Sequence, residues 1–206
     1  IHKAERSIDG TIKYSLQLHD KLLVEGVLIP SKKRLTACIS SQVGCSLACD
    51  FCATGKLKLD RNLTTAEIYD QVFILNEEAI STFGKPLSNI VYMGMGEPLL
   101  NYKSLLGSID FITNQHGLEM SPKRITVSTA GIASMINKLA DDEVKFNLAI
   151  SLHTAVDSKR DILMPLNQKI KLAELRESIR YFYDKTGIRV TYEYILLKNL
   201  NDSIED

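Results

Sequence analysis

Four cysteines near the start of the chain are the residues best suited to do chemistry. They are Cys38, Cys45, Cys49 and Cys52, and the 154 residues after Cys52 contain no further cysteine. A secreted fold held together by disulfides would spread its cysteines along the chain to join distant loops. The clustering therefore indicates a local site, and a metal centre is the chemistry that it favours.

Three of these cysteines have a spacing that suits one metal centre. Cys45, Cys49 and Cys52 form a C-x3-C-x2-C pattern, which one tight loop can wrap around a single cluster. A closed zinc site and an ordinary iron–sulfur cluster each take four protein ligands, so three thiolates leave one metal position open for a substrate. Leu47 and Phe51 within the loop would shield the sulfurs. The alternative is a zinc knuckle that recruits Cys38 as its fourth ligand.

Polar residues follow three of the predicted strands. A glycine-rich turn, Gly94–Pro98, contains Gly96 and Glu97; Ser128 ends the next strand; Ser151, Leu152 and His153 end the one after. Active sites of α/β barrels gather where the strands end, and glycine lets the backbone approach a ligand closely. Taken singly, the glycine-rich turn could be only a turn and His153 a hydrogen-bonded core histidine.

The elements that position these residues alternate along the chain. Residues 11–18 and 22–29 predict a β-hairpin, which Pro30 ends. Thr64 and Glu67 form a capping box that opens a helix, with Ile68, Val72, Leu75 and Ala79 on one face. Apolar strands are predicted near 35–40, 89–94, 124–129, 146–152 and 189–196, and further helices near 103–116, 132–141 and 172–185.

This order predicts an α/β fold in which a parallel sheet is covered by helices. Parallel strands that are almost wholly apolar and separated by helices need right-handed crossovers. An incomplete (β/α) barrel fits best, and the chain divides into an N-terminal hairpin extension (1–30) and a core (31–206).

Composition excludes several classes of protein. The chain has 206 residues, 45% hydrophobic and 24% charged, which is typical of a folded globular domain. It contains no apolar run long enough to span a membrane and no signal-peptide core, so we expect a cytoplasmic protein without a membrane partner.

Charge is distributed unevenly although the formal net charge is zero. Residues 1–62 carry ten Lys and Arg against six Asp and Glu, and residues 63–206 carry fifteen against nineteen. The basic excess lies near the cysteines in sequence, so a polyanion could bind the same face; a solvated charged loop is the alternative. These basic residues are Lys32, Lys33, Arg34, Lys56, Lys58 and Arg61.

Both ends of the sequence suggest a longer natural protein. The chain begins at Ile1 rather than Met, and Ser203 to Asp206 read as a helix start with no helix after it.

The cysteine pattern, with an aromatic residue directly before the last cysteine, resembles the radical S-adenosylmethionine superfamily. Further motifs occur in an order that resembles the dual-specificity RNA adenine-C2 methyltransferases within it. These are residues 38–45 (CISSQVGC), 61–64 (RNLT), 93–98 (MGMGEP), 128–129 (ST) and 151–153 (SLH). The similarity runs from about residue 9 to the end and implies an incomplete barrel of six β/α units.

The resemblance implies two cofactors, a [4Fe-4S] cluster and S-adenosylmethionine. Cys45, Cys49 and Cys52 would hold the cluster, whose open iron chelates S-adenosylmethionine. Electron transfer, for example from a flavodoxin-type reductant, then produces a 5′-deoxyadenosyl radical. The residues implied to contact S-adenosylmethionine are Gly96, Glu97, Ser128, Ser151, Leu152 and His153.

The same resemblance implies two catalytic residues. In the family, a methyl group carried by a cysteine near the C-terminus becomes a carbon radical and adds to adenine C2 of 23S rRNA or tRNA. Cys38 matches the cysteine that releases the product by forming a disulfide, and Glu25 matches the proposed base for the C2 proton. Glu25 stands in an otherwise apolar strand, where a buried carboxylate is costly unless it is paired. The alternatives are a small buried strand residue for Cys38 and an outward-facing carboxylate for Glu25.

Two departures from the family pattern qualify these expectations. No cysteine follows Cys52, so the methyl-carrying cysteine is absent and this chain should at most bind the cluster and cleave S-adenosylmethionine. Lys58-Leu59-Asp60 stands where the family often has Gly-Phe. The alternatives are the related adenine-C8 methyltransferases and a non-catalytic zinc-binding RNA module. We expect a monomer.

Overall fold

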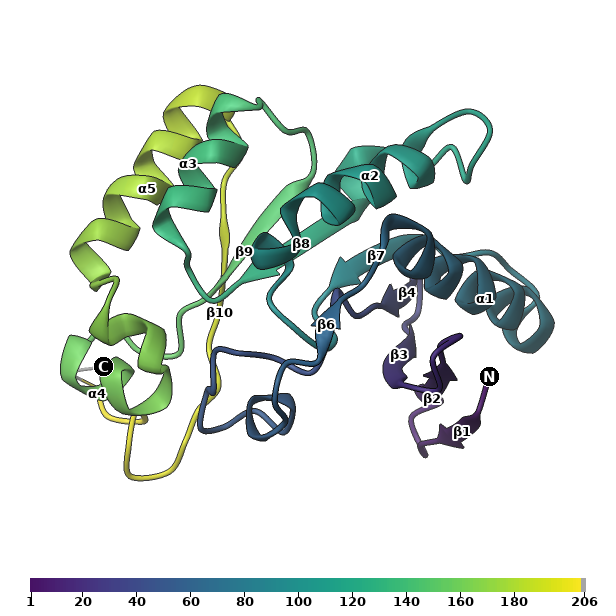
Figure 1. The fold of residues 1–206 in the computed structure, drawn as a ribbon, viewed down its shortest axis with the longest axis horizontal. Helices are drawn as coiled ribbons and strands as arrows, with labels where there is room; N and C mark the ends of the chain where they lie inside the picture. The colour runs from purple at the N-terminus through teal and green to yellow at the C-terminus, as the bar shows by residue number, and fades with distance from the viewer. Residues whose placement is uncertain (205–206) are drawn as a thin grey trace.

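A computed structural model describes residues 1–204 of the chain. Its main sheet has eight strands and is twisted (Figure 1). Its strand order is β1-β2-β3-β4-β7-β8-β9-β10. The strands of this sheet are β1 (Lys3–Arg6), β2 (Ile12–Gln17), β3 (Leu23–Pro30), β4 (Leu35–Cys38), β7 (Asn89–Tyr92), β8 (Ile125–Thr129), β9 (Asn147–Ser151) and β10 (Thr191–Glu193). Strands β4 and β7 to β10 are parallel. The predicted α/β class, with five parallel strands, is confirmed.

Helices connect the parallel strands and bury one face of the sheet. They are α1 (Thr65–Phe83), α2 (Tyr102–Thr113), α3 (Ala133–Asp141), α4 (Asp157–Leu163) and α5 (Leu172–Thr186). Thr64 caps α1, since its hydroxyl accepts from the Glu67 N–H while the Glu67 carboxylate accepts from the Thr64 N–H, so the predicted capping box is confirmed. Alternate strand residues such as Ile90, Val127 and Leu148 face the helices and are fully buried.

The N-terminal segment forms three antiparallel strands rather than a hairpin alone. Strands β2 and β3 are the predicted hairpin, and β1, which the sequence did not predict, pairs with β2. Strand β3 continues the sheet because residues Val27 to Pro30 pair antiparallel with β4. The two segments therefore share one sheet, and their division at residue 30 stays a prediction.

Two features depart from the predicted elements. Helix α4 was not predicted, because its seven residues, DSKRDIL, have no apolar periodicity. Several strands end earlier than predicted, β7 at Tyr92 and β4 at Cys38, since the chain turns there into the loops of the site. The helix start predicted at Ser203–Asp206 extends into residues 205–206, which lie outside the described residues.

The sheet is open between its edge strands β1 and β10 in the part of the chain that the structure describes, as an incomplete barrel requires. No helix within residues 1–204 is long and apolar enough to cross a membrane.

Candidate active site

The loop that carries three of the cysteines is closed at its base by a short pair of strands. Strands β5 (Gln42–Val43) and β6 (Arg61–Asn62) pair antiparallel, and residues 44–60 between them form what we call the cysteine loop. Gly44 has φ +77°, and a Cβ there would lie 1.9 Å from the Lys58 carbonyl oxygen. Only glycine therefore fits where the start of the cysteine loop passes against its later residue Lys58.

The cysteine loop is also held to the far side of the sheet. The Asp50 N–H donates to the Leu163 carbonyl of α4 at 3.0 Å. Leu47, Cys49 and Phe51 pack against Leu163 and Met164. These contacts place the loop over the carboxyl ends of the parallel strands.

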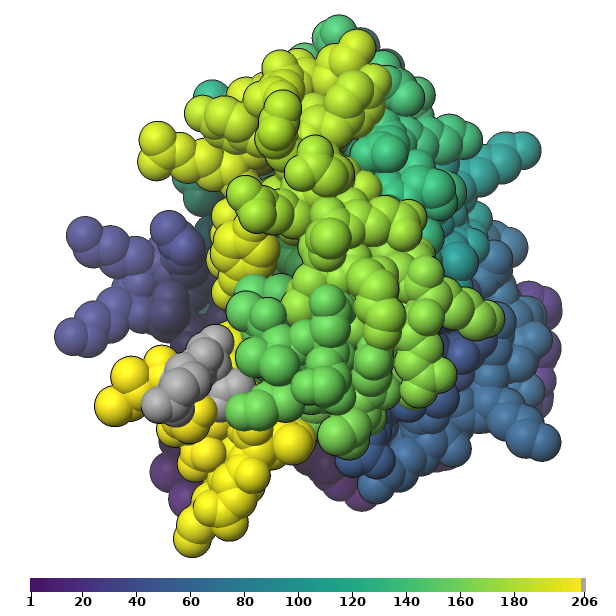
Figure 2. All heavy atoms as spheres, turned by 90° about the vertical axis from the view of Figure 1, so that its left-hand side faces the viewer, coloured from purple at the N-terminus to yellow at the C-terminus, as the bar shows by residue number. Residues whose placement is uncertain are grey.

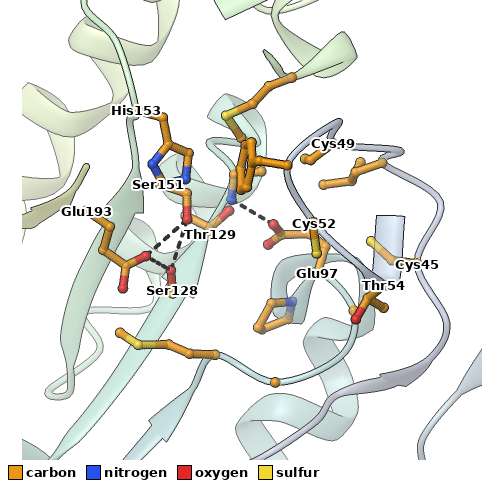
Figure 3. A pocket seen from close by; sticks show the side chains of 18 of the residues that line it. Cys45, Cys49, Cys52, Thr54, Glu97, Ser128, Thr129, Ser151, His153 and Glu193 are labelled. Atoms are coloured by element: carbon orange, nitrogen blue, oxygen red, sulfur yellow. Dashed lines mark hydrogen bonds between the residues drawn. The ribbon is translucent and has the colours of Figure 1, made fainter. Parts of the chain in front are cut away.

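The three loop thiols line one cavity of about 430 Å³ (Figure 3). Cys45, Cys49 and Cys52 are partly exposed free thiols. Burial raises the pKa of Cys45, and it raises the pKa of Cys49 to about 11. Within residues 1–204, no group of three Cys, His, Asp or Glu side chains is close enough together to hold a metal ion. The donor set nevertheless fits a thiolate-bound cluster, since three thiols of one loop face the same space.

Cys38 lies apart from these three. It is buried at the end of β4, its sulfur accepts from the Met93 N–H, and burial raises the pKa of its thiol to about 11. Met93 lines the cavity whereas Cys38 is not among the lining residues. The four cysteines thus separate into three that face the cavity and one behind its wall, which disfavours the zinc knuckle.

Glu97 is a buried carboxylate in the cavity wall. It is 3% exposed, and its two oxygens accept from the Ala130 N–H at 2.7 Å and the Leu99 N–H at 3.0 Å. Burial raises the pKa of Glu97, although these hydrogen bonds oppose the shift. The carboxylate is therefore fixed before any ligand arrives.

Glycine is required at position 96 for a local packing reason that the sequence did not predict. Its φ is +94°, and a Cβ would lie 2.4 Å from the Gln42 Cβ. The side-chain oxygen of Gln42 also accepts from the Glu97 N–H at 2.8 Å. Gly96 thus allows close packing on Gln42 and positions Glu97, while it also lines the cavity.

Ser128 and Ser151 meet a carboxylate that sequence reasoning missed. Both hydroxyls donate to the Glu193 Oε2, at 2.6 Å and 3.0 Å. Figure 3 shows these three side chains on one side of the cavity and Cys45 and Cys52 on the other. Glu193 ends β10, inside the predicted strand 189–196, so its strand-end position was the available signal.

His153 lines the same cavity and Leu152 does not. The His153 backbone has φ +60°, its Nδ1 accepts from the Ile195 N–H at 3.2 Å, and its ring meets the Phe51 ring edge-on at 4.5 Å. Burial lowers the pKa of His153, which favours the neutral ring. The Leu152 N–H donates to the Glu193 carbonyl, so Leu152 contributes backbone contacts beside the site. We call Glu97, Ser128, Ser151, His153 and Glu193 the strand-end rim.

Glu25 does not have the buried environment that was expected. Its side chain is 51% exposed and pairs with the Lys13 Nζ at 3.1 Å. Strand β3 points Glu25 away from the helix-covered core, where its neighbours Val24 and Gly26 are buried. The expectation of burial is therefore wrong, and the role as a base stays a prediction.

Of the basic residues, Lys56 and Lys58 lie within the cysteine loop, but the other four do not join them in one patch around the cysteines. Lys32, Lys33 and Arg34 lie in the turn before β4, whereas the cysteine loop follows the opposite end of that strand. Arg61 is committed to ion pairs with Asp20 and Glu67 at 2.6 Å and 2.8 Å. Closeness in sequence did not predict closeness in space, because strand β4 separates the turn that holds Lys32, Lys33 and Arg34 from the cysteine loop.

A family model described as the Radical SAM superfamily matches residues 39–206, and the chain belongs to that superfamily. A probable dual-specificity RNA methyltransferase RlmN of Flavobacterium psychrophilum is 57% identical over 201 residues, which is 98% of this chain and 58% of that protein. A protein of the same name from Christiangramia forsetii is 56% identical over the whole chain and 58% of its own length. The chain thus spans somewhat more than half the length of these curated relatives.

A solved structure supports the fold directly. The crystal structure of a radical SAM methyltransferase from Sphaerobacter thermophilus matches with a TM-score of 0.95 and 40% identity, over 98% of this chain and 60% of that one. The expected fold class and superfamily are confirmed.

Proposed function

We propose that this chain forms the radical core of an RNA methyltransferase that modifies adenine C2 in 23S rRNA and tRNA. The observation that carries the proposal is that the cysteine loop and the strand-end rim line one cavity. The names of the curated relatives support the RNA substrates and the methyl transfer.

In this proposal the cavity holds both cofactors. A [4Fe-4S] cluster on Cys45, Cys49 and Cys52 supplies, when bound, the electron that cleaves S-adenosylmethionine to a 5′-deoxyadenosyl radical. Gly96, Glu97, Ser128, Ser151 and His153 line the part of the cavity that would bind S-adenosylmethionine, and Leu152 would contribute through its backbone beside them. We add Glu193, because its carboxylate joins both serines on the side away from the cysteines.

The cavity wall gives the bound molecule a fixed polar surround. Glu97 presents a carboxylate whose position two main-chain N–H groups fix, and Phe51 and Met164 exclude water from one side. Preorganised groups in a partly desolvated site orient a ligand at little cost in entropy.

Cys38 and Glu25 are proposed to act on later steps. Cys38 would attack the sulfur whose methyl-derived carbon has joined adenine and form a disulfide with that cysteine outside this chain. The S–C bond breaks, and its electron pair together with a proton completes the methyl group on the product. The Cys38 thiol must first lose a proton. Glu25, on the adjacent strand β3, would take the C2 proton. We further propose a flavodoxin-type reductant, a monomeric state and a cytoplasmic location.

The first test uses this chain reconstituted anaerobically with iron and sulfide. We expect a brown protein with about four irons that cleaves S-adenosylmethionine to 5′-deoxyadenosine after reduction. Cys45→Ala should lose iron and cleavage together, whereas Cys38→Ala should keep its iron because Cys38 does not face the cavity. A colourless protein with one zinc would replace this function with the zinc-binding module.

A further inference from the structure

Arg160 of α4 is the largest fully buried side chain of the described residues, with 1% exposure. Its guanidinium lies beneath the carboxyl ends of β8 and β9. Nη2 donates to the carbonyls of Ala130 at 2.7 Å and Ser151 at 3.1 Å, and Nε donates to that of Leu152 at 3.2 Å. Arg160 therefore holds together the ends of two strands that supply the strand-end rim.

The charge of Arg160 has only neutral acceptors within residues 1–204. Besides the three carbonyls, Nη1 donates to the Asn167 Oδ1 at 3.0 Å. The acids nearest in sequence are held by other groups. Asn167 Nδ2 donates to Asp157 at 2.9 Å and Asp161 at 2.7 Å, and Asp161 also pairs with Lys171.

Burying a guanidinium without a carboxylate contact is costly, and arginine keeps its charge in proteins. Such a cation is stabilised if a negative group lies close by in the functional state. The arrangement is therefore hard to explain from the local hydrogen bonds alone.

The cysteine loop brings candidate negative charge to this position. The backbone of α4 contacts the loop through Leu163 and Asp50, and Cys49 packs against the cluster formed by Ala130, Leu163 and Met164. The carbonyl of Ala130, a member of that cluster, also accepts from Arg160 Nη2, so Cys49 and the guanidinium share Ala130 as a neighbour. Burial lowers the pKa of Arg160, and negative charge on Cys49, as in a metal-bound thiolate, opposes this shift. Figure 2 shows α4, in green, beside the yellow C-terminal segment on this face of the molecule.

We propose that Arg160 is a positioning residue that supplies a buried positive charge close to Cys49 of the cysteine loop and fixes the ends of β8 and β9. The proposal rests on the proposed function, because it takes the three cysteines to hold an iron–sulfur cluster. Reduction adds one negative charge to such a cluster, and a fixed cation nearby favours that state. Arg160 should thus raise the reduction potential of the centre.

The test compares variants that separate charge from geometry. Arg160→Lys keeps the charge and loses the forked hydrogen bonds, and Arg160→Gln loses both. Arg180→Gln is the matched control, since Arg180 is an exposed arginine of α5 that pairs only loosely with Asp184 at 3.8 Å. Each chain is reconstituted with iron and sulfide, and its midpoint potential is measured by a redox titration followed by electron paramagnetic resonance.

We expect a clearly more negative potential for Arg160→Gln, a potential close to wild type for Arg160→Lys, and no change for Arg180→Gln. Thermal melting of the iron-free chains measures the structural role separately, and both Arg160 variants should melt lower than wild type. Equal potentials in the lysine and glutamine variants would overturn the role of the charge. If neither the Arg160→Lys nor the Arg160→Gln chain folds, Arg160 is a structural residue, and the proposed role of its charge is also overturned.

The two proposals fail in different ways. If the wild-type chain takes up no iron–sulfur cluster, the proposed function fails before any variant is compared. If the wild type takes up the cluster and Arg160→Gln leaves its potential unchanged, only the inference about Arg160 fails.

Discussion

The cysteine loop and the strand-end rim face each other across one cavity, but they are prepared for ligands to different degrees. Each polar side chain of the rim has a hydrogen-bond partner: Glu97 on two N–H groups, Ser128 and Ser151 on Glu193, and His153 on the Ile195 N–H. The three loop thiols share a cavity but are not gathered into a metal-binding group. A sheet fixes its strand ends through its own packing, whereas an irregular loop leaves the final convergence of its ligands to the metal.

The largest expected effect comes from a substitution that distorts the cysteine loop and leaves the strand-end rim unchanged. Gly44→Ala should lower the iron content of the reconstituted chain at least tenfold, because a Cβ at φ +77° would overlap the Lys58 carbonyl. The iron-free chain should melt within about 5 °C of wild type, since the core lies elsewhere. Iron analysis and thermal melting measure the two effects.

A matched glycine controls for backbone strain in that experiment. Gly84 also has a positive φ, +68°, but has open space around its Cβ position. Gly84→Ala should cost about 1 kcal/mol and keep the full iron content. Full iron content in Gly44→Ala would show that the loop has no need of this crossing.

The next effect comes from a substitution in the strand-end rim, which should lower both the stability of the fold and the affinity for S-adenosylmethionine. Glu97→Ala leaves the buried N–H groups of Ala130 and Leu99 without their acceptor, so we expect a loss of about 2–4 kcal/mol in the free energy of unfolding. Binding of S-adenosylmethionine should weaken at least tenfold. Urea unfolding and equilibrium dialysis test this, and unchanged stability would contradict a preorganised rim.

A smaller effect is expected at Glu193, which is half-buried on the edge strand β10. Glu193→Gln keeps one oxygen for Ser128 and Ser151 but loses the charge, so S-adenosylmethionine should bind about tenfold more weakly with little change in stability. Glu177→Gln, an exposed change on α5, is the control. Equal affinity in both variants would remove Glu193 from the site.

The smallest effect lies outside both regions and depends on pH. Arg61 lowers the pKa of Glu67 to about 2, so this pair stabilises the fold above the ordinary pKa of glutamate and loses its contribution as pH falls towards 2. Glu67→Gln should cost about 1–2 kcal/mol at pH 7, and its difference from wild type should shrink towards pH 2. Urea unfolding at several pH values measures it, with Glu77→Gln as the control on the same helix. A difference that stays constant with pH would contradict the ion pair.

Much of the fold was predictable because its signals are local. The capping box at Thr64 and Glu67 and the buried runs of β7, β8 and β9 depend on residues that are neighbours in sequence. Helix α4 lacked such a signal, since its charged sequence has no apolar periodicity and its buried Arg160 contacts strand ends that are distant in sequence.

The candidate site likewise has features that local sequence predicts and features that it does not. The spacing of Cys45, Cys49 and Cys52 within one loop was sufficient to predict a shared thiolate site. The pairing of Ser128 with Glu193 joins residues 65 positions apart, and the exposure of Glu25 depends on which face of β3 packs against α1. No local pattern contains that information.

The sequence by itself indicated the superfamily through the resemblance of its motifs. Spacing and periodicity, which express local geometry, predicted the alternation of the five parallel strands with α1, α2, α3 and α5 and the separation of three cysteines from a fourth, but not β1 or α4. Only the tertiary structure decided that Cys38 lies behind the cavity wall, that Glu193 completes the rim, and that an arginine is buried beneath it. These features arise where segments distant in sequence pack together, and there the cost of desolvation selects which polar groups meet.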